Sequence, residues 1–397
     1  MLSERFNNYL LSEKFYTEKE IFNQPETWIR VWENFKKNKS ELRKFFENII
    51  VKEKNDFSII LTGAGTSAYI GDVLLGIFSL NFNNPISAVA TTDIITHPEF
   101  YFNHKKKYLL ISFARSGNSP ESSQAINLAE KFAEKIYHLI ITCSENSSLV
   151  QTVADKKHFN LFMPAEAEDK GLAMTSSFTS MLLTGLLISK IYKDENLDIQ
   201  MDLIYKYAKR IISFYSKELR KVSSLDFKRA VFLGSGMLKG VARESHLKLQ
   251  ELTDGRVICK YDSFLGFRHG PKAVIDDTSL VVYLFSNNAY VNLYEMDLAK
   301  DLISTGKNLY SIGVMEQELD IDTDLKIILS DNSYKIQEEF LPLVSIIPAQ
   351  LLGYYKSLSL GLNPDSPSRS GMIHRVVQGV RIYPYIEKTE NIDDNRK

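Results

Sequence analysis

The chain has 397 residues, with 48 Lys and Arg against 49 Asp and Glu, so its formal net charge is −1. At about 150 residues per domain, this length predicts two to three domains, each large enough to bury a core. A charge so close to zero gives no field that could hold DNA or a membrane surface, so we expect neither as a partner. The two cysteines, Cys143 and Cys259, are too few for a disulfide framework and too isolated for a zinc site, which favours a cytoplasmic location.

Residues 1–48 are polar and place their aromatic and aliphatic side chains at helical spacing, which predicts a helical N-terminal segment. The chain begins without the features of a secretory signal, and apolar stretches such as 181–188 are far shorter than the roughly 18 residues of a membrane span. Further along, short apolar runs at 58–61, 108–113 and 137–142 are each followed by a Gly or Ser turn and then by a helical stretch. Strands that alternate with helices in this way predict a doubly wound parallel α/β sheet.

The first of these strands leads into Gly63-Ala64-Gly65-Thr66-Ser67. A dinucleotide-binding fingerprint would need a third glycine where Ala68 stands, so a Rossmann cofactor site is disfavoured and we expect no cofactor. Thr66 and Ser67 are instead good donors for a sugar hydroxyl or a phosphate oxygen.

The second strand ends in a loop rich in serine, 114–123, which is followed by a helical pattern. Hydroxyls and main-chain N–H groups at the start of a helix favour a phosphate-sized anion, and Arg115 could add a charge-assisted hydrogen bond. Ser116 and Ser119 are the expected hydroxyl donors. The simpler alternative is capping of the helix by Ser119, with Pro120 at the first helical position.

Sliding the chain against itself reveals a repeat, because the strand and turn at 59–65 recur at 230–236, an offset of 171 residues. Further apolar elements match at the same offset. We therefore predict two tandem copies of one α/β unit, at 49–210 and 215–385, followed by a polar tail at 386–397. The alternative is that two unrelated α/β domains share a similar strand spacing.

The helix expected in the second copy carries Glu244 and Glu251, which are seven residues apart and hence on one face, with Lys248 between them. A solvated charged face is the plain interpretation. A proton-transfer pair is the alternative, because His269 follows in the turn 267–272 and a histidine near a glutamate can move protons at physiological pH. No histidine spacing typical of a metal site occurs, so no metal is expected.

These motifs together resemble the sugar isomerase (SIS) domain proteins. The resemblance rests on Gly65-Thr66-Ser67, the loop ARSGNSPES, Gly171-Leu172-Ala173 with the TSSFT run that follows, RESHLKLQEL and FRHGP. With the tail that begins at Arg375, the pattern is similar to the AgaS group of amino-sugar-phosphate deaminases and ketose-aldose isomerases. It implies tandem flavodoxin-like domains, sugar-phosphate ligands and homo-oligomers, dimers or tetramers, with sites at subunit contacts.

By motif position, the resemblance implies roles taken from the isomerase domain of glucosamine-6-phosphate synthase. Ser67, Ser116 and Ser119 match phosphate and sugar ligands, Glu251 the enolisation base, Glu244 a neighbouring carboxylate and His269 the ring-opening histidine. Ala114 stands in place of a phosphate-binding serine, and Arg115 in place of a glutamine, which predicts a more ionic phosphate site.

The synthase also needs a glutaminase domain and a C-terminal lysine, and this chain has no counterpart of either. The resemblance therefore implies the reverse sense, deamination of galactosamine 6-phosphate to tagatose 6-phosphate. The alternatives are a simple tagatose/fructose-6-phosphate isomerase, a fructosamine-phosphate deglycase, and a regulator that binds sugar phosphate without turnover.

Overall fold

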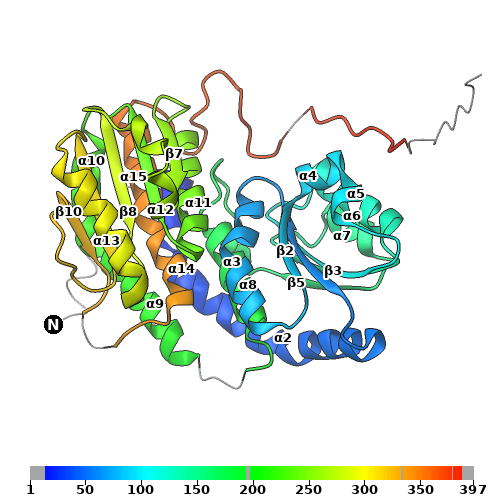
Figure 1. Ribbon diagram of the computed structural model, residues 1–397. Helices are drawn as coiled ribbons and strands as arrows, with labels where there is room; N and C mark the ends of the chain where they lie inside the picture. The colour runs from blue at the N-terminus through cyan, green and yellow to red at the C-terminus, as the bar shows by residue number, and fades with distance from the viewer. Residues whose placement is uncertain (1–13, 194–196, 332–333, 378, 387–397) are drawn as a thin grey trace, which may run out of the picture.

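In the computed structural model, residues 14–193, 197–331, 334–377 and 379–386 are described, and they form two α/β halves joined by helices (Figure 1). The first half contains α1 (Tyr16–Phe22), α2 (Gln24–Glu53), β1 (Ser58–Gly63), α3 (Thr66–Asn81), β2 (Ile86–Ala90), α4 (Thr91–Thr96), α5 (Pro98–Tyr101), β3 (Lys107–Ala114), α6 (Pro120–Phe132), β4 (Lys135–Thr142), α7 (Ser148–Val153), β5 (His158–Phe162) and α8 (Ser176–Ser189).

The second half begins with α9 (Asp198–Arg210), a π-helical turn (Ile211–Tyr215) and α10 (Ser216–Ser223). It continues with β6 (Arg229–Gly234), α11 (Met237–Leu252), β7 (Ile258–Asp262), α12 (Phe264–Phe267), β8 (Ser279–Leu284), α13 (Ala289–Ser304), β9 (Tyr310–Met315), β10 (Leu325–Ile328), α14 (Leu341–Ser345) and α15 (Ile347–Ser359). Short 3-10 turns lie at Ala165–Ala167, Pro271–Val274 and Glu338–Phe340.

Each half has one five-stranded sheet, and every strand pair in it is parallel. The strand orders are β2-β1-β3-β4-β5 and, read from the opposite edge, β7-β6-β8-β9-β10. The two orders are equivalent, so both sheets are doubly wound about the same kind of switch point. The prediction of two α/β units with parallel sheets and a helical N-terminal segment is confirmed.

The offset of 171 residues relates the observed elements of the two halves. It carries β1 onto β6 and α3 onto α11, each with matching first and last residues, and it places α8 on α15. Even the turns agree, since Gly65 and Gly236 both precede their helix with φ near +54°, at 54° and 53°. A side chain is strained at such an angle, which explains a glycine at each place.

The predicted domain boundaries remain predictions, because the structure does not test them. The predicted N-terminal segment 1–48 falls short of the end of α2, which runs to Glu53. The predicted boundary at 210–215 falls on the continuous helical run from α9 through the π-helical turn to α10. Of the predicted tail, 387–397 lie outside the described residues.

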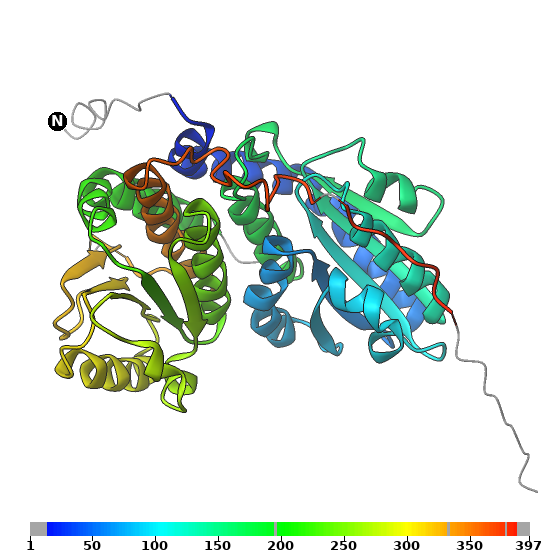
Figure 2. The same cartoon turned by 90° about the horizontal axis from the view of Figure 1, so that it is seen from above.

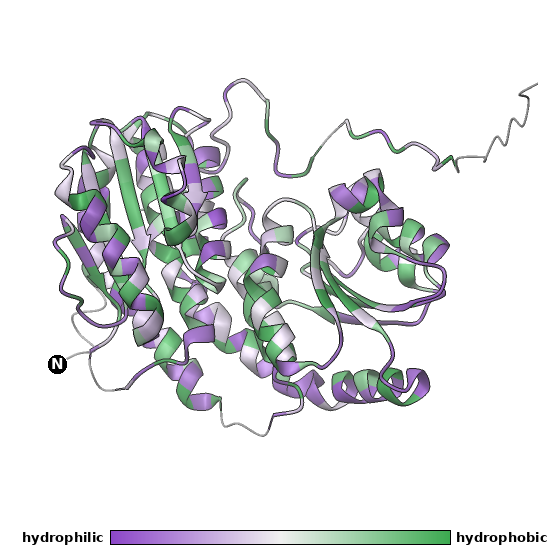
Figure 3. Cartoon of the chain, viewed as in Figure 1, coloured by the Kyte–Doolittle hydropathy of each residue, from purple (hydrophilic) through white to green (hydrophobic). Residues whose placement is uncertain are grey.

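Helices α3, α8, α11 and α15 lie between the two sheets, as seen from above in Figure 2. Strand side chains alternate: Ile59 and Leu61 face these helices, whereas Ile60 faces the outer layer with α6. The inner faces of both sheets share one continuous hydrophobic core. In Figure 3 the strands and α8 are mostly hydrophobic, whereas α11 carries both hydrophobic and hydrophilic residues. The two halves are therefore packed together through α3 and α11.

Replacing Gly240 by alanine is expected to force α3 and α11 apart. An ideal Cβ at Gly240 would lie 2.9 Å from the main-chain N of Val73, which has no room to yield. We expect a loss of about 1–3 kcal/mol in the free energy of unfolding, measured by chemical denaturation. Gly76→Ala on α3 is the control, because its Cβ would meet no atom within 4 Å. Equal stability of the two variants would refute this close approach.

Candidate active site

Helix α11 directs three charged side chains towards the first turn of α3. Glu244 is 0% exposed and Lys248 1% exposed, while the Glu251 side chain keeps 23% of its surface. The Lys248 Nζ lies 3.3 Å from Glu244 Oε1 and 2.7 Å from Glu251 Oε2. Their spacing of four and three residues places all three on one face of the helix. The interpretation of this face as solvated is wrong, because α3 packs onto it.

Thr66, the first residue of α3, completes this group, which we call the carboxylate cluster (Thr66, Glu244, Lys248 and Glu251). Its hydroxyl accepts a hydrogen bond from Lys248 Nζ at 3.1 Å and donates one to Glu244 Oε1 at 3.3 Å. Glu244 Oε2 is buried without a hydrogen-bond partner in the described part of the chain. The cluster thus joins residues of both halves and keeps one buried acceptor unused.

Burial sets the protonation of the cluster. Loss of solvent raises the pKa of Glu244 to about 8, although the nearby Lys248 ammonium opposes this rise. For Lys248, burial acts to lower the pKa, but the two carboxylates outweigh it and the pKa is raised. Burial therefore favours the protonated form of Glu244, beside a lysine cation. Glu251 is the carboxylate that reaches solvent, so it is the one a ligand can meet.

The pKa of Glu244 predicts a pH-dependent stability. The pKa of Glu244 is about 8 in the folded chain and 4.5 in its ordinary state. Between these two pH values the folded chain therefore keeps a proton on Glu244 that the unfolded chain has lost. The stabilising contribution of this proton is complete below about pH 4.5 and is lost as the pH rises towards 8. We expect Glu244→Gln, whose amide stays neutral, to gain stability relative to the parent chain over this range in chemical denaturation. A difference independent of pH would contradict this.

The serine-rich loop lies at the carboxyl end of β3, between this strand and α6. Ser119 occupies the N-cap position and Pro120 the first helical position, yet no side chain caps α6. The Ser119 hydroxyl donates instead to the carboxylate of Glu121, and the Ser116 hydroxyl accepts from the N–H of Asn118 at 3.3 Å. The prediction that Ser119 caps the helix is therefore wrong, and the start of α6 has no carboxylate or hydroxyl acceptor of its own.

Ser67 lies in the first turn of α3 and is 4% exposed. Its hydroxyl faces the sulfur of Met174 at 3.9 Å, so it borders the segment that leads into α8. Ser67 thus follows Thr66 of the carboxylate cluster on the first turn of α3. Their contact with a sugar or phosphate remains a prediction.

The side chain of Arg115 is buried and is already occupied. One terminal nitrogen donates to the carbonyl of Leu172 at 3.1 Å, and the other to the carbonyl of Arg375. Burial lowers the pKa of the guanidinium, and the carboxylate of Asp169 acts in the opposite direction. The predicted direct contact between Arg115 and phosphate would compete with these two bonds.

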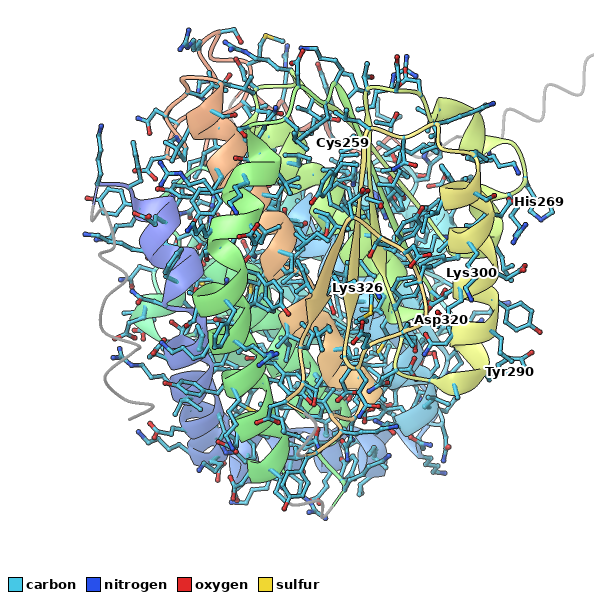
Figure 4. All side chains as sticks on the ribbon, turned by 90° about the vertical axis from the view of Figure 1, so that its left-hand side faces the viewer. Cys259, His269, Tyr290, Lys300, Asp320 and Lys326 are labelled. Atoms are coloured by element: carbon cyan, nitrogen blue, oxygen red, sulfur yellow. The ribbon has the colours of Figure 1, made fainter. Side chains whose placement is uncertain are left out.

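His269 lies on the outer surface, in the turn after α12, and its ring makes no side-chain hydrogen bond to the described residues. Figure 4 shows it pointing away from the molecule beside α13. Its neighbour Arg268 is bound to Asp297 on that helix at 2.7 Å. Within one chain His269 therefore does not lie beside Glu251. The predicted pairing of these two residues requires a second copy of the chain.

Residues 51–189 match the SIS domain family. A D-galactosamine-6-phosphate deaminase AgaS from Shewanella sp. (strain ANA-3) is 39% identical over 377 residues, which cover 94% of this chain and 93% of that protein. This chain belongs to the AgaS family of SIS-domain proteins. The resemblance inferred from the motifs is confirmed.

Two solved structures extend the AgaS comparison. Tagatose-6-phosphate ketose/aldose isomerase from Escherichia coli has 38% identity and a TM-score of 0.83, over 94% of this chain and 98% of its own. The C-terminal domain of glucosamine-fructose-6-phosphate aminotransferase from Francisella tularensis has the same fold, with 21% identity and a TM-score of 0.69, over 88% of this chain and 97% of its own.

Two charged residues of this AgaS-family chain, Lys248 and Asp169, were given no role in the sequence analysis. Lys248 is central to the cluster, and the signal for it was a lysine set between two glutamates on one helical face. Asp169 is fully buried and accepts hydrogen bonds from the N–H groups of Thr175, Ser176 and Ser177 at 2.8 to 2.9 Å, which satisfies the start of α8. No sequence spacing identifies such a distant cap.

Two other features are absent from the described residues. No group of three or more His, Cys, Asp or Glu side chains that could hold a metal ion occurs among them. In the same part of the chain, no helix combines the length and the apolar character that a membrane crossing needs.

Proposed function

We propose that this chain deaminates galactosamine 6-phosphate to tagatose 6-phosphate in the cytoplasm. The buried carboxylate cluster carries the proposal, because it sets a protonated carboxyl, a lysine cation and an accessible carboxylate beside the start of α3. The deaminase from Shewanella supports the substrate, and the AgaS and isomerase relatives establish the chain as an enzyme.

In this reaction the open-chain amino sugar carries an aldehyde at C1 and an amine at C2. Glu251 takes the C2 proton, and the electron pair forms a C1–C2 double bond while a proton reaches the C1 oxygen. Return of a proton to C1 leaves an iminium at C2. Water adds to this carbon, and ammonia leaves as the ketone forms. A positioned acid–base pair of this kind contributes typically ~10² to 10⁴ in rate.

The remaining residues bind and orient the substrate. The open start of α6, with Ser116 and Ser119, would hold the phosphate by main-chain and hydroxyl donors. For Ser119 this requires its hydroxyl to leave the carboxylate of Glu121. Ser67 and Thr66 would hold the sugar. The lysine cation of the cluster holds the Glu251 carboxylate in place at 2.7 Å, and Glu244, whose pKa burial raises, is the nearby proton donor.

We further propose that the chain acts as a homo-oligomer, a dimer or tetramer. His269 is exposed and points outward, so it can assist ring opening only in the site of a neighbouring copy. Mixing inactive Glu251→Gln and His269→Ala variants tests this, because shared sites should restore part of the activity. Complete absence of restored activity in mixed oligomers would contradict the role of His269.

A simple aldose-ketose isomerase is the second candidate, favoured by the activity for which the Escherichia coli structure is named. The same proton transfer would serve it, without loss of an amine. A panel of galactosamine, glucosamine, tagatose and fructose 6-phosphates separates the two. We expect ammonia from galactosamine 6-phosphate, and conversion of the ketose phosphates without any ammonia release from the amino sugars would overturn the deaminase.

A further inference from the structure

The segment 363–377, which we call the strap, leaves the second half after α15 and crosses back over the first (Figures 1 and 2). It is anchored at its beginning by Asp365. The Asp365 carboxylate accepts from the N–H of Thr17 at 2.8 Å, and its carbonyl accepts from the N–H of Leu172 at 3.0 Å. The strap therefore rests on the segment that leads into α8.

Its far end is held by Arg375. The Arg375 Nε donates to the carbonyl of Asp169 at 2.9 Å, and a terminal nitrogen binds the carboxylate of Glu168 at 3.0 Å. The carboxylate of Asp169 is itself committed to the start of α8. The Arg375 side chain thus binds the main chain of the first half at Asp169, the residue whose carboxylate caps α8.

Arg115 closes this arrangement from the other side. It reaches from the serine-rich loop to the carbonyl of Leu172 and to the carbonyl of Arg375 itself. Arg115 is 7% exposed, so these carbonyl bonds replace water that would otherwise solvate its guanidinium. We call Arg115 and Arg375, with these carbonyl partners, the arginine clasp. It ties three separate segments together.

The clasp borders the proposed active site on two sides. Arg115 is the residue immediately before Ser116, and Met174, in the segment that the clasp holds, lies against the Ser67 hydroxyl at 3.9 Å. Burial lowers the pKa of Arg115, and the Glu251 carboxylate is among the charges that oppose this effect. Movement of the strap would therefore shift the hydroxyls of both Ser116 and Ser67.

We propose that Arg115 is a positioning residue, which locks the strap at Arg375 and so fixes Ser116 and Ser67 for substrate binding. This inference rests on the proposed function. In this proposal Arg115 does not contact the phosphate. Hydroxyl and main-chain donors bind the anion, and Arg115 holds the segments that carry these donors. Arg375 shares this task although its sequence position is 260 residues away.

Direct contact of Arg115 with phosphate and its action through the clasp predict different effects of replacing Arg375. If Arg115 acts through the clasp, Arg115→Gln and Arg375→Gln should each raise KM and weaken inorganic phosphate binding by roughly ten- to hundredfold. The double variant should be no worse than either single one, because both open the same clasp. Hydrogen exchange in the strap should rise in all three. Arg381→Gln is the control, since Arg381 lies over Tyr383 outside the clasp.

Weaker phosphate binding in Arg115→Gln alone, with unchanged exchange in the strap and normal binding in Arg375→Gln, would overturn the inference in favour of direct contact. Arg375 is partly exposed, so its variant remains informative if Arg115→Gln fails to fold. Phosphate binding and hydrogen exchange need no turnover. A wild-type chain that releases no ammonia would therefore refute the proposed function and still leave the clasp tested.

Discussion

Glu251→Gln is expected to abolish turnover while the substrate still binds. Glutamine keeps the size and polarity of the side chain but cannot take the C2 proton, so only the chemical step is lost. We expect kcat for ammonia release to fall by about 10² to 10⁴, the range that general acid–base catalysis supplies. Calorimetric binding of galactosamine 6-phosphate should change little, because uniform binding contacts are kept.

Glu218→Gln is the matched control for this variant. Glu218 is also a helical glutamate paired with a lysine three residues away, at 2.9 Å, but it lies on the exposed face of α10. We expect wild-type turnover from it. Retention of activity in Glu251→Gln would remove the proposed base and with it the mechanism.

Lys248→Met should destabilise the folded chain severely. The Lys248 side chain is 1% exposed and contacts Thr66, Glu244 and Glu251 at once. Its removal leaves the buried Thr66 and Glu244 and the part-buried Glu251 without their shared donor. Removing one partner of a buried ion pair costs about 3 to 5 kcal/mol in the free energy of unfolding. Chemical denaturation measures this loss directly.

Lys221→Met provides the comparison, because Lys221 makes the same kind of helical pair with Glu218 in solvent. An exposed pair of this kind is worth about 0 to 1 kcal/mol. The double variant Lys248→Met/Glu251→Gln should recover part of the lost stability, since the carboxylate without its cation is then neutral. Equal losses in Lys248→Met and Lys221→Met would mean that the cluster is not buried in solution.

The architecture could be predicted from the sequence because it depends on local patterns. Apolar runs of strand length, each with a small-residue turn and a helix, identify a parallel sheet without knowledge of the partner strands. The offset of 171 residues then relates β1 to β6 and α3 to α11. The boundary predicted at 210–215 stays a prediction, because α9 and α10 run together there through a π-helical turn.

The site was predictable only in part, because the sequence states which residues share a helical face and not what covers that face. Glu244 and Glu251 were found by spacing, but the burial of Lys248 between them depends on the packing of α3. Arg115 illustrates the same limit. Its carbonyl partner at Arg375 is distant in sequence, so only the folded chain reveals that its guanidinium is already occupied.

Galactosamine 6-phosphate carrying deuterium at C2 provides the sharpest test of proton abstraction from C2. If Glu251 moves the C2 proton, the products followed by NMR should be ammonia and tagatose 6-phosphate, with the deuterium transferred to C1 or lost to water. The rate should also show a primary isotope effect. Ammonia release with deuterium still bound at C2, or no release at all, would contradict the account.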